Sequence, residues 1–80
     1  MIPKTEQLYR ILAFPKHLQT TVLTLIKVGS GTAVDVAKVT GKARAVESAY
    51  LNQLVTMKIA RKERKARKAF FSVDLEALDW

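Results

Sequence analysis

The chain has 80 residues, a formal net charge of +7 and 49% hydrophobic residues. A chain of this length builds one small domain and buries only roughly 60% of the surface that its unfolded form exposes, which favours association with a partner chain. It contains no cysteine and one histidine, which excludes disulfides and a cysteine-based zinc site. We therefore expect no metal, no cofactor and no redox role.

The hydrophobic residues are too numerous for a disordered polar segment, yet no apolar run approaches the roughly 20 residues that span a bilayer. The first ten residues, MIPKTEQLYR, lack the continuous apolar core of a signal peptide. The sequence therefore predicts a soluble, cytoplasmic protein without a membrane partner.

Two helices are expected in the first 28 residues. In the segment 1–14, Leu8, Ile11 and Leu12 have the spacing of one helical face. Pro15 ends this segment, because the residue before a proline is biased away from the helical region, and a second helix follows over 15–28. Its apolar stripe consists of Leu18, Val22, Leu25 and Ile26.

A short third helix is predicted over 33–40, after the connector Gly29-Ser30-Gly31. Thr32 is placed to cap its first turn, with Asp35 at the capping-box position. The segment is rich in β-branched residues, so packing must stabilise it. Gly41 then allows a sharp reversal, through either a positive φ angle or a close helix approach.

The helix predicted over 43–57 is the longest well-formed element. At about 100 degrees per residue, its apolar face gathers Ala43, Val46, Tyr50, Leu54 and Met57. Its outward face carries Arg44, Ala45, Ser48, Ala49 and Asn52, of which Arg44 and Asn52 can pair with guanine or adenine edges. Glu47 is expected to pair with a cation or to lie at the edge of the core.

The segment after this helix is open to two interpretations. Residues 58–68 would continue the helix by local propensity, whereas residues 69–73 are rich in the aromatic and β-branched types of a strand. The second interpretation is a hairpin that joins 59–62 to 67–73 and turns around 63–66. Phe71 and Val73 would then share one side, and the cations would lie outside.

Positive charge is concentrated in the second half of the chain. Residues 42–73 carry nine Lys and Arg against two Glu, which is typical of a surface that binds a polyanion. The candidate DNA-binding residues are Lys42, Arg44, Ser48, Asn52, Arg61, Lys62, Arg64, Lys65, Arg67 and Lys68.

The order of these elements resembles the winged helix-turn-helix family of DNA-binding domains, in particular small regulators of the multiple-antibiotic-resistance and arsenic-repressor types. The pattern T-x-x-D/E-[LIV]-A-x-x-x-G is matched by Thr32, Asp35, Val36, Ala37 and Gly41, and is followed by Leu51, Leu54, Ile59 and Phe70 or Phe71. The chain has Lys58 where the family usually has Gly, and alanine at 43 and 45 where it usually has Ser or Thr.

The resemblance implies a recognition helix in the major groove, beginning near Lys42, and a wing that contacts phosphates or the minor groove. The predicted fold is mainly α with a small β-hairpin: one winged helix-turn-helix domain over 1–80, with an extra N-terminal helix over 1–14, a wing over 59–73 and a short C-terminal tail over 74–80.

The predicted function is a double-stranded DNA-binding transcriptional regulator, associated with the nucleoid. The alternatives are an architectural DNA-binding protein of low sequence specificity and a protein-interaction winged helix in a larger complex. His17 has no nucleophile or carboxylate near it in sequence, so we expect no catalytic residue and no enzyme.

Apolar residues at both ends exceed what a minimal domain of this kind needs. We expect them to form a homodimer interface, with Leu8, Ile11, Leu12, Phe14, Leu78 and Trp80 as its candidate residues. A two-fold dimer would place two recognition helices about 34 Å apart and predicts an inverted-repeat binding site.

Overall fold

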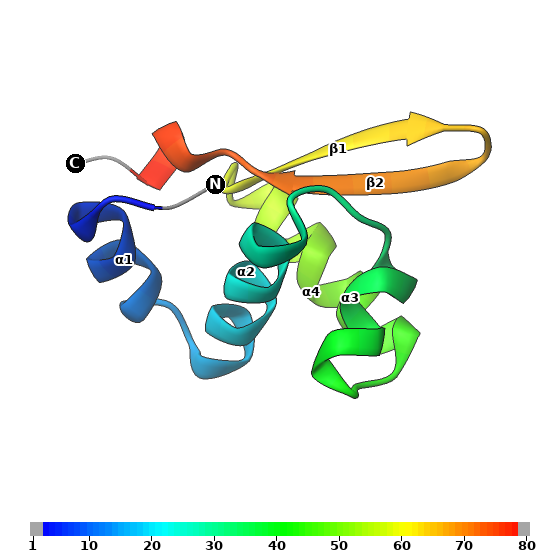
Figure 1. Cartoon of the computed structure of the whole chain (residues 1–80), viewed down its shortest axis with the longest axis horizontal. Coiled ribbons are helices and arrows are strands. Elements are labelled where there is room, and N and C mark those ends of the chain that lie inside the picture. Colours follow the sequence, from blue (N-terminus) through cyan, green and yellow to red (C-terminus); the bar gives the residue numbers. More distant parts are fainter. Residues whose placement is uncertain (1–2, 79–80) are drawn as a thin grey trace.

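The computed structural model describes residues 3–78, which form four helices, a β-hairpin and a terminal 3-10 helix. The helices are α1 (Thr5–Leu12), α2 (Lys16–Val28), α3 (Ala33–Thr40) and α4 (Arg44–Thr56), and the later elements are β1 (Ala60–Lys65), β2 (Lys68–Val73) and η1 (Leu75–Leu78). Figure 1 shows the helices on one side of the hairpin, whose tip extends beyond them. The predicted mainly α fold with a small hairpin is confirmed, and the alternative of a continuous helix through 58–68 is wrong.

The turn that separates α3 from α4 follows the local sequence signals. The Thr32 hydroxyl accepts a hydrogen bond from the Asp35 N–H at 3.2 Å, and the Asp35 carboxylate accepts one from the Thr32 N–H at 2.9 Å. At the other end of α3, Gly41 has φ 77°, and no atom would crowd a Cβ there. Positive φ, and not close packing, is therefore the reason for glycine at this turn.

Helix α4 ends at the position where related domains usually carry glycine. Lys58 adopts φ 64°, its N–H donates to the Val55 carbonyl, and the Ile59 N–H donates to the Leu54 carbonyl, both at 2.9 Å. These two bonds form a Schellman motif, which stops the helix and turns the chain into β1. Lys58 thus takes the left-handed conformation that glycine would adopt without strain.

The hydrophobic core lies among α2, α4 and the base of the hairpin. It consists of Ile11, Leu18, Val22, Leu25, Ile26, Val36, Leu51, Leu54, Ile59, Ala60, Phe71, Val73 and Leu78. The predicted stripe of α2 is buried as expected, which makes this helix the centre of the domain.

The predicted inward face of α4 is confirmed at Leu54 and is wrong at Val46 and Met57. Glu47, Leu51 and Leu54 are buried, whereas Val46 and Met57 are exposed and Tyr50 is half-buried. This orientation places both leucines in the core, a larger apolar gain than Val46 and Met57 would supply.

The same orientation buries Glu47 completely. Its two carboxyl oxygens accept hydrogen bonds from the hydroxyls of Thr21, at 2.8 Å, and Thr40, at 2.5 Å. Its partners are therefore hydroxyl groups of α2 and α3, and the expectation of a cation partner or of a position at the core edge is wrong. Burial of a carboxyl group requires such partners.

The hairpin turns later than predicted. Its strands pair from Ala60 opposite Val73 to Lys65 opposite Lys68, which leaves Ala66 and Arg67 as a two-residue turn with φ of 49° and 66°. Positive φ at both central residues matches the twist of the flanking strands. Neither residue type favours that conformation, so the sequence carried no signal for the position of the turn.

The base of the hairpin is attached to the connector before α3. The Gly31 N–H donates to the Phe71 carbonyl at 3.0 Å, and the Phe71 N–H donates to the Gly31 carbonyl at 2.8 Å. A Cβ at Gly31 would lie 3.2 Å from side-chain atoms of Val28 and Asp35. Glycine therefore lets the connector approach β2 closely at this point.

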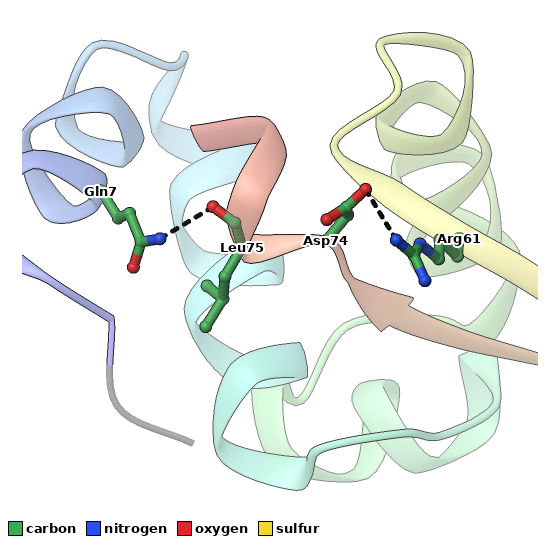
Figure 2. Close-up of polar contacts among 4 residues, drawn as sticks. All are labelled: Gln7, Arg61, Asp74 and Leu75. Carbon is green, nitrogen blue, oxygen red and sulfur yellow. Dashed lines mark hydrogen bonds and ion pairs between the residues drawn. The ribbon is translucent and has the colours of Figure 1, made fainter. Parts of the chain in front are cut away.

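The two ends of the chain pack together. Figure 2 shows the Gln7 side chain of α1 reaching the backbone of η1, where its amide donates to the Leu75 carbonyl at 2.9 Å. Ile11 and Leu78 are buried within this chain, so the expectation that they form a dimer interface is wrong: the protomer itself covers them.

The other candidate interface residues differ in exposure. Leu8 is 40% and Leu12 62% exposed, whereas Phe14 is half-buried against the core. Trp80 lies outside the described residues.

Candidate nucleic-acid interface

A groove of about 600 Å³ runs between the start of α3, the outward face of α4 and the wing. Its lining residues are Thr32, Ala33, Val34, Asp35, Lys38, Arg44, Ser48, Asn52, Lys62, Arg64, Arg67, Lys68, Ala69, Phe70 and Phe71. The groove therefore brings together seven of the ten residues that the sequence identified as candidate DNA contacts.

Helix α4 contributes Arg44, Ser48 and Asn52 to the groove. Their spacing of four residues places them on one helical face, beside the face that buries Leu51 and Leu54. Arg44 is exposed, and within residues 3–78 its guanidinium makes no hydrogen bond or ion pair. Its five donors are therefore free for a ligand.

The wing contributes cations from one side of β1 and from its turn. Side chains alternate between the two sides of a strand, and Lys62 and Arg64 lie on the side of the buried Phe71, toward the groove. Arg67 and Lys68 complete the set at the tip. In the described part of the chain, the side chains of Arg64, Arg67 and Lys68 have no hydrogen-bond or ion-pair partner.

Two other candidate wing cations lie outside the groove. Figure 2 shows the Arg61 guanidinium beside Asp74, with a nitrogen to oxygen distance of 3.2 Å. Lys65 lies 3.5 Å from Glu63. The strand register decides this separation, because odd-numbered residues of β1 lie on the face away from Phe71.

Lys42 also lies outside the groove, at the entrance to α4. Its ammonium is 5.3 Å from the centre of the Tyr50 ring, within the range of a cation–π contact. On the same ring, the His17 imidazole packs with a centroid distance of 4.7 Å. Tyr50 thus joins α4 to α2.

The sequence analysis did not identify Lys38 and Asp35 as groove residues. Lys38 follows the capping residue Asp35 by three positions, so both lie on the same face of α3; this spacing was the available signal. The Thr32 N–H bonded to the Asp35 carboxylate lowers the pKa of that group, and burial opposes this effect. The Thr32 side chain, and then the charges of Lys38 and Lys68, lower the pKa further.

The electrostatic character of the groove follows from its lining. Among the described residues that line it, the cationic side chains are Lys38, Arg44, Lys62, Arg64, Arg67 and Lys68, and the anionic one is Asp35. A concave surface lined by one sign of charge raises the local concentration of the opposite charge. The groove therefore suits a polyanion.

Two other kinds of feature, a metal-binding cluster and a membrane-spanning helix, are absent from the region 3–78. That region holds no cluster of three or more His, Cys, Asp or Glu side chains that could bind a metal ion. None of its helices is long and apolar enough to cross a membrane.

Together, α3, the Gly41 turn, α4 and the hairpin define a winged helix-turn-helix domain. No family model matches the chain. An uncharacterized protein of Archaeoglobus fulgidus is 39% identical to it over 57 residues, which cover 71% of this chain and 77% of that protein. The chain belongs to the same protein family as this archaeal protein.

Solved structures share the fold. The AntR antimony-specific transcriptional repressor has a TM-score of 0.70 with 24% identity over 89% of this chain. A predicted DNA-binding transcriptional regulator from E. coli has a TM-score of 0.72 with 21% identity over 90% of this chain. An ArsR family transcriptional regulator has a TM-score of 0.61 with 24% identity over 96% of this chain.

The chain spans 64% of the AntR chain, 75% of the E. coli chain and 80% of the ArsR family chain. At these identities the likeness concerns the fold. The predicted resemblance to the winged helix-turn-helix family is confirmed at that level.

Proposed function

We propose that this protein is a double-stranded DNA-binding transcriptional regulator. The observation that carries the proposal is the basic groove between the outward face of α4 and the wing, whose side chains at Arg44, Arg64, Arg67 and Lys68 have no hydrogen-bond or ion-pair partner among residues 3–78. Unpaired cations next to a helix that can enter a major groove suit the phosphates that border that groove.

In this proposal α4 lies in the major groove and the wing follows the adjacent backbone. Arg44, in the first turn of α4, contacts a guanine edge, and Ser48, one turn later, contacts a neighbouring base. Arg64, Arg67 and Lys68 contact phosphates or the minor groove. Lys42, at the entrance to α4, contacts the phosphate beside the helix.

The solved structures that share the fold are those of a repressor and of transcriptional regulators, which supports a regulatory and non-catalytic role. A regulator of this kind acts on chromosomal DNA, so the proposal includes a cytoplasmic, nucleoid-associated location.

The test is a titration of the protein against duplexes selected from a random pool and against scrambled duplexes, at several salt concentrations. We expect selected duplexes to bind roughly a thousandfold more tightly than scrambled ones. Each phosphate contact should contribute about −0.9 to the slope of log affinity against log salt. Absence of binding to any duplex would refute the proposal and would favour a protein-interaction role.

A second candidate, an architectural protein of low sequence specificity, is favoured by one observation. The outward face of α4 carries alanine at 45 and 49, so few of its side chains can read a base edge. The same titration separates the two candidates. A selected pool without a consensus, combined with a steep salt dependence, supports the architectural role.

We further propose that the regulator is a homodimer. Leu8 and Leu12 lie one helical turn apart on α1 and are exposed. Each chain has few side chains that can read a base, so a second copy of the chain would increase sequence specificity. Sedimentation at tens of micromolar should show a species of twice the 9.0 kDa chain mass. A 9.0 kDa species, together with a selected site that lacks an inverted repeat, would contradict the dimer.

A further inference from the structure

The polar groups of Asn52 are already engaged within the chain. Its side-chain amide donates to the Ser48 carbonyl at 2.8 Å, one turn earlier in α4. Its side-chain oxygen accepts a hydrogen bond from the Lys62 ammonium of the wing at 3.1 Å. Pairing with an adenine edge needs the amide and the oxygen together, and the two bonds orient these groups toward Ser48 and Lys62.

Lys62 connects this helix to the most firmly anchored point of the wing. It pairs across the hairpin with Phe71, which is buried and is hydrogen-bonded to Gly31 through both its N–H and its carbonyl. The Lys62 ammonium lies 5.7 Å from the centre of the Phe71 ring, within cation–π range. The Lys62 ammonium therefore contacts both α4 and the base of the wing.

Beyond this point the described part of the wing makes no side-chain hydrogen bond to α4, and toward α3 the charge of Lys68 acts on Asp35. Within residues 3–78, the Lys62 bond to Asn52 is the side-chain hydrogen bond that joins β1 to α4. The remaining side-chain ion pairs of the wing join Arg61 to Asp74 and Lys65 to Glu63, away from α4. The direction of the projecting tip relative to α4 is therefore controlled at Lys62.

We propose that Asn52 and Lys62 act as a latch that holds the wing at a fixed angle to the recognition helix, and that Asn52 is a positioning residue and does not read a base. The inference rests on the proposed function and narrows base reading to Arg44 and Ser48. It also separates Lys62 from the cations that contact phosphates, although Lys62 and Arg64 lie on the same side of the same strand.

The first test needs no DNA. Amide hydrogen exchange of residues 63–70 is compared in the wild type, Asn52→Ala, Lys62→Met and the double variant, with Arg64→Met as the matched control. Loss of one hydrogen bond should speed exchange in the wing about threefold to tenfold in either single variant. The double variant should be no faster than the singles, and the control should match the wild type. Unchanged exchange in both single variants would refute the latch.

The second test uses DNA. Asn52→Ala should retain the wild-type preference at every base position while it weakens all duplexes alike. Arg64→Met should reduce the salt slope by about 0.9, and Lys62→Met by less than half of that. Loss of an adenine preference at one position in Asn52→Ala would overturn the positioning role. If the wild type bound no duplex, the proposed function would fail, while the exchange experiment would still decide the latch.

Discussion

The buried carboxyl group of Glu47 provides the sharpest test of how the recognition helix is held. Glu47 is fully buried on α4 and joins three helices, because its oxygens accept hydrogen bonds from Thr21 of α2 and Thr40 of α3. Replacement by alanine removes both acceptors, the γ-methylene group and the carboxyl carbon. Replacement by glutamine retains the shape and one acceptor oxygen.

The cost of Glu47→Ala can be estimated from these contacts. Each lost hydrogen bond contributes about 1 to 1.5 kcal/mol, and each buried methylene about 0.8 kcal/mol. The variant should therefore lose about 3 to 4 kcal/mol of unfolding free energy. A chain of 80 residues is expected to have only about 4 to 12 kcal/mol in total, so the variant should be near the limit of folding.

Glu47→Gln should cost only about 1 kcal/mol. Its amide can donate to the Thr21 oxygen if that hydroxyl turns toward the His17 carbonyl, which already lies 3.2 Å away. The other side of the glutamine then accepts from Thr40. Rescue by glutamine separates loss of the hydrogen bonds from a general intolerance of this position.

The assay is urea unfolding followed by far-ultraviolet circular dichroism. Glu63→Ala is the matched control, because Glu63 is 69% exposed and has only a loose ion pair with Lys65; its removal should change stability by less than about 0.5 kcal/mol. A loss below about 1 kcal/mol in Glu47→Ala, or an equal loss in Glu47→Gln, would refute this account of the three-helix junction.

Three further changes test the backbone and the cap. Lys58→Gly should raise stability by about 0.5 to 1 kcal/mol in the same assay, because it removes the side chain from a residue with left-handed backbone conformation; a lower stability would contradict this. Gly31→Ala should cost about 1 to 2 kcal/mol, since its Cβ would crowd Val28, and an unchanged midpoint would argue against that contact. The pKa of Asp35 in the folded chain is below its ordinary value of 3.8, so the Asp35 carboxylate stabilises the fold above pH 3.8. This stabilisation is lost as the pH falls through the folded pKa. The stability difference between wild type and Asp35→Ala should therefore shrink below pH 3.8; a constant difference would exclude this linkage.

Much of the fold could be predicted from local signals. The capping box of Thr32 and Asp35, the Gly41 turn and the stripe of α2 all depend on residues within about four positions of one another, so the sequence displays them directly. The candidate site was also largely visible, because cations on α4 and on the wing are few enough to enumerate. Their division into groove and non-groove residues was not visible.

The orientation of α4 shows why the rest could not be predicted. An apolar stripe calculated along the helix treats Glu47 as a surface residue, and it is buried only because Thr21, which lies 26 residues earlier in the chain, supplies a hydroxyl. The burial of Ile11 and Leu78 likewise depends on the contact between α1 and η1, the two ends of the chain. Patterns within one segment carry no information about such partners.

By itself, the sequence determined the four helices, the cap and turn between α3 and α4, and the excess of positive charge after Gly41, because each depends on neighbouring residues or on composition. Only the tertiary structure decided which face of α4 is buried, where the wing turns, and that Lys62 contacts Asn52 while Arg61 contacts Asp74. The physical reason is strand alternation: a shift of one residue in the register would exchange the two sides of the wing.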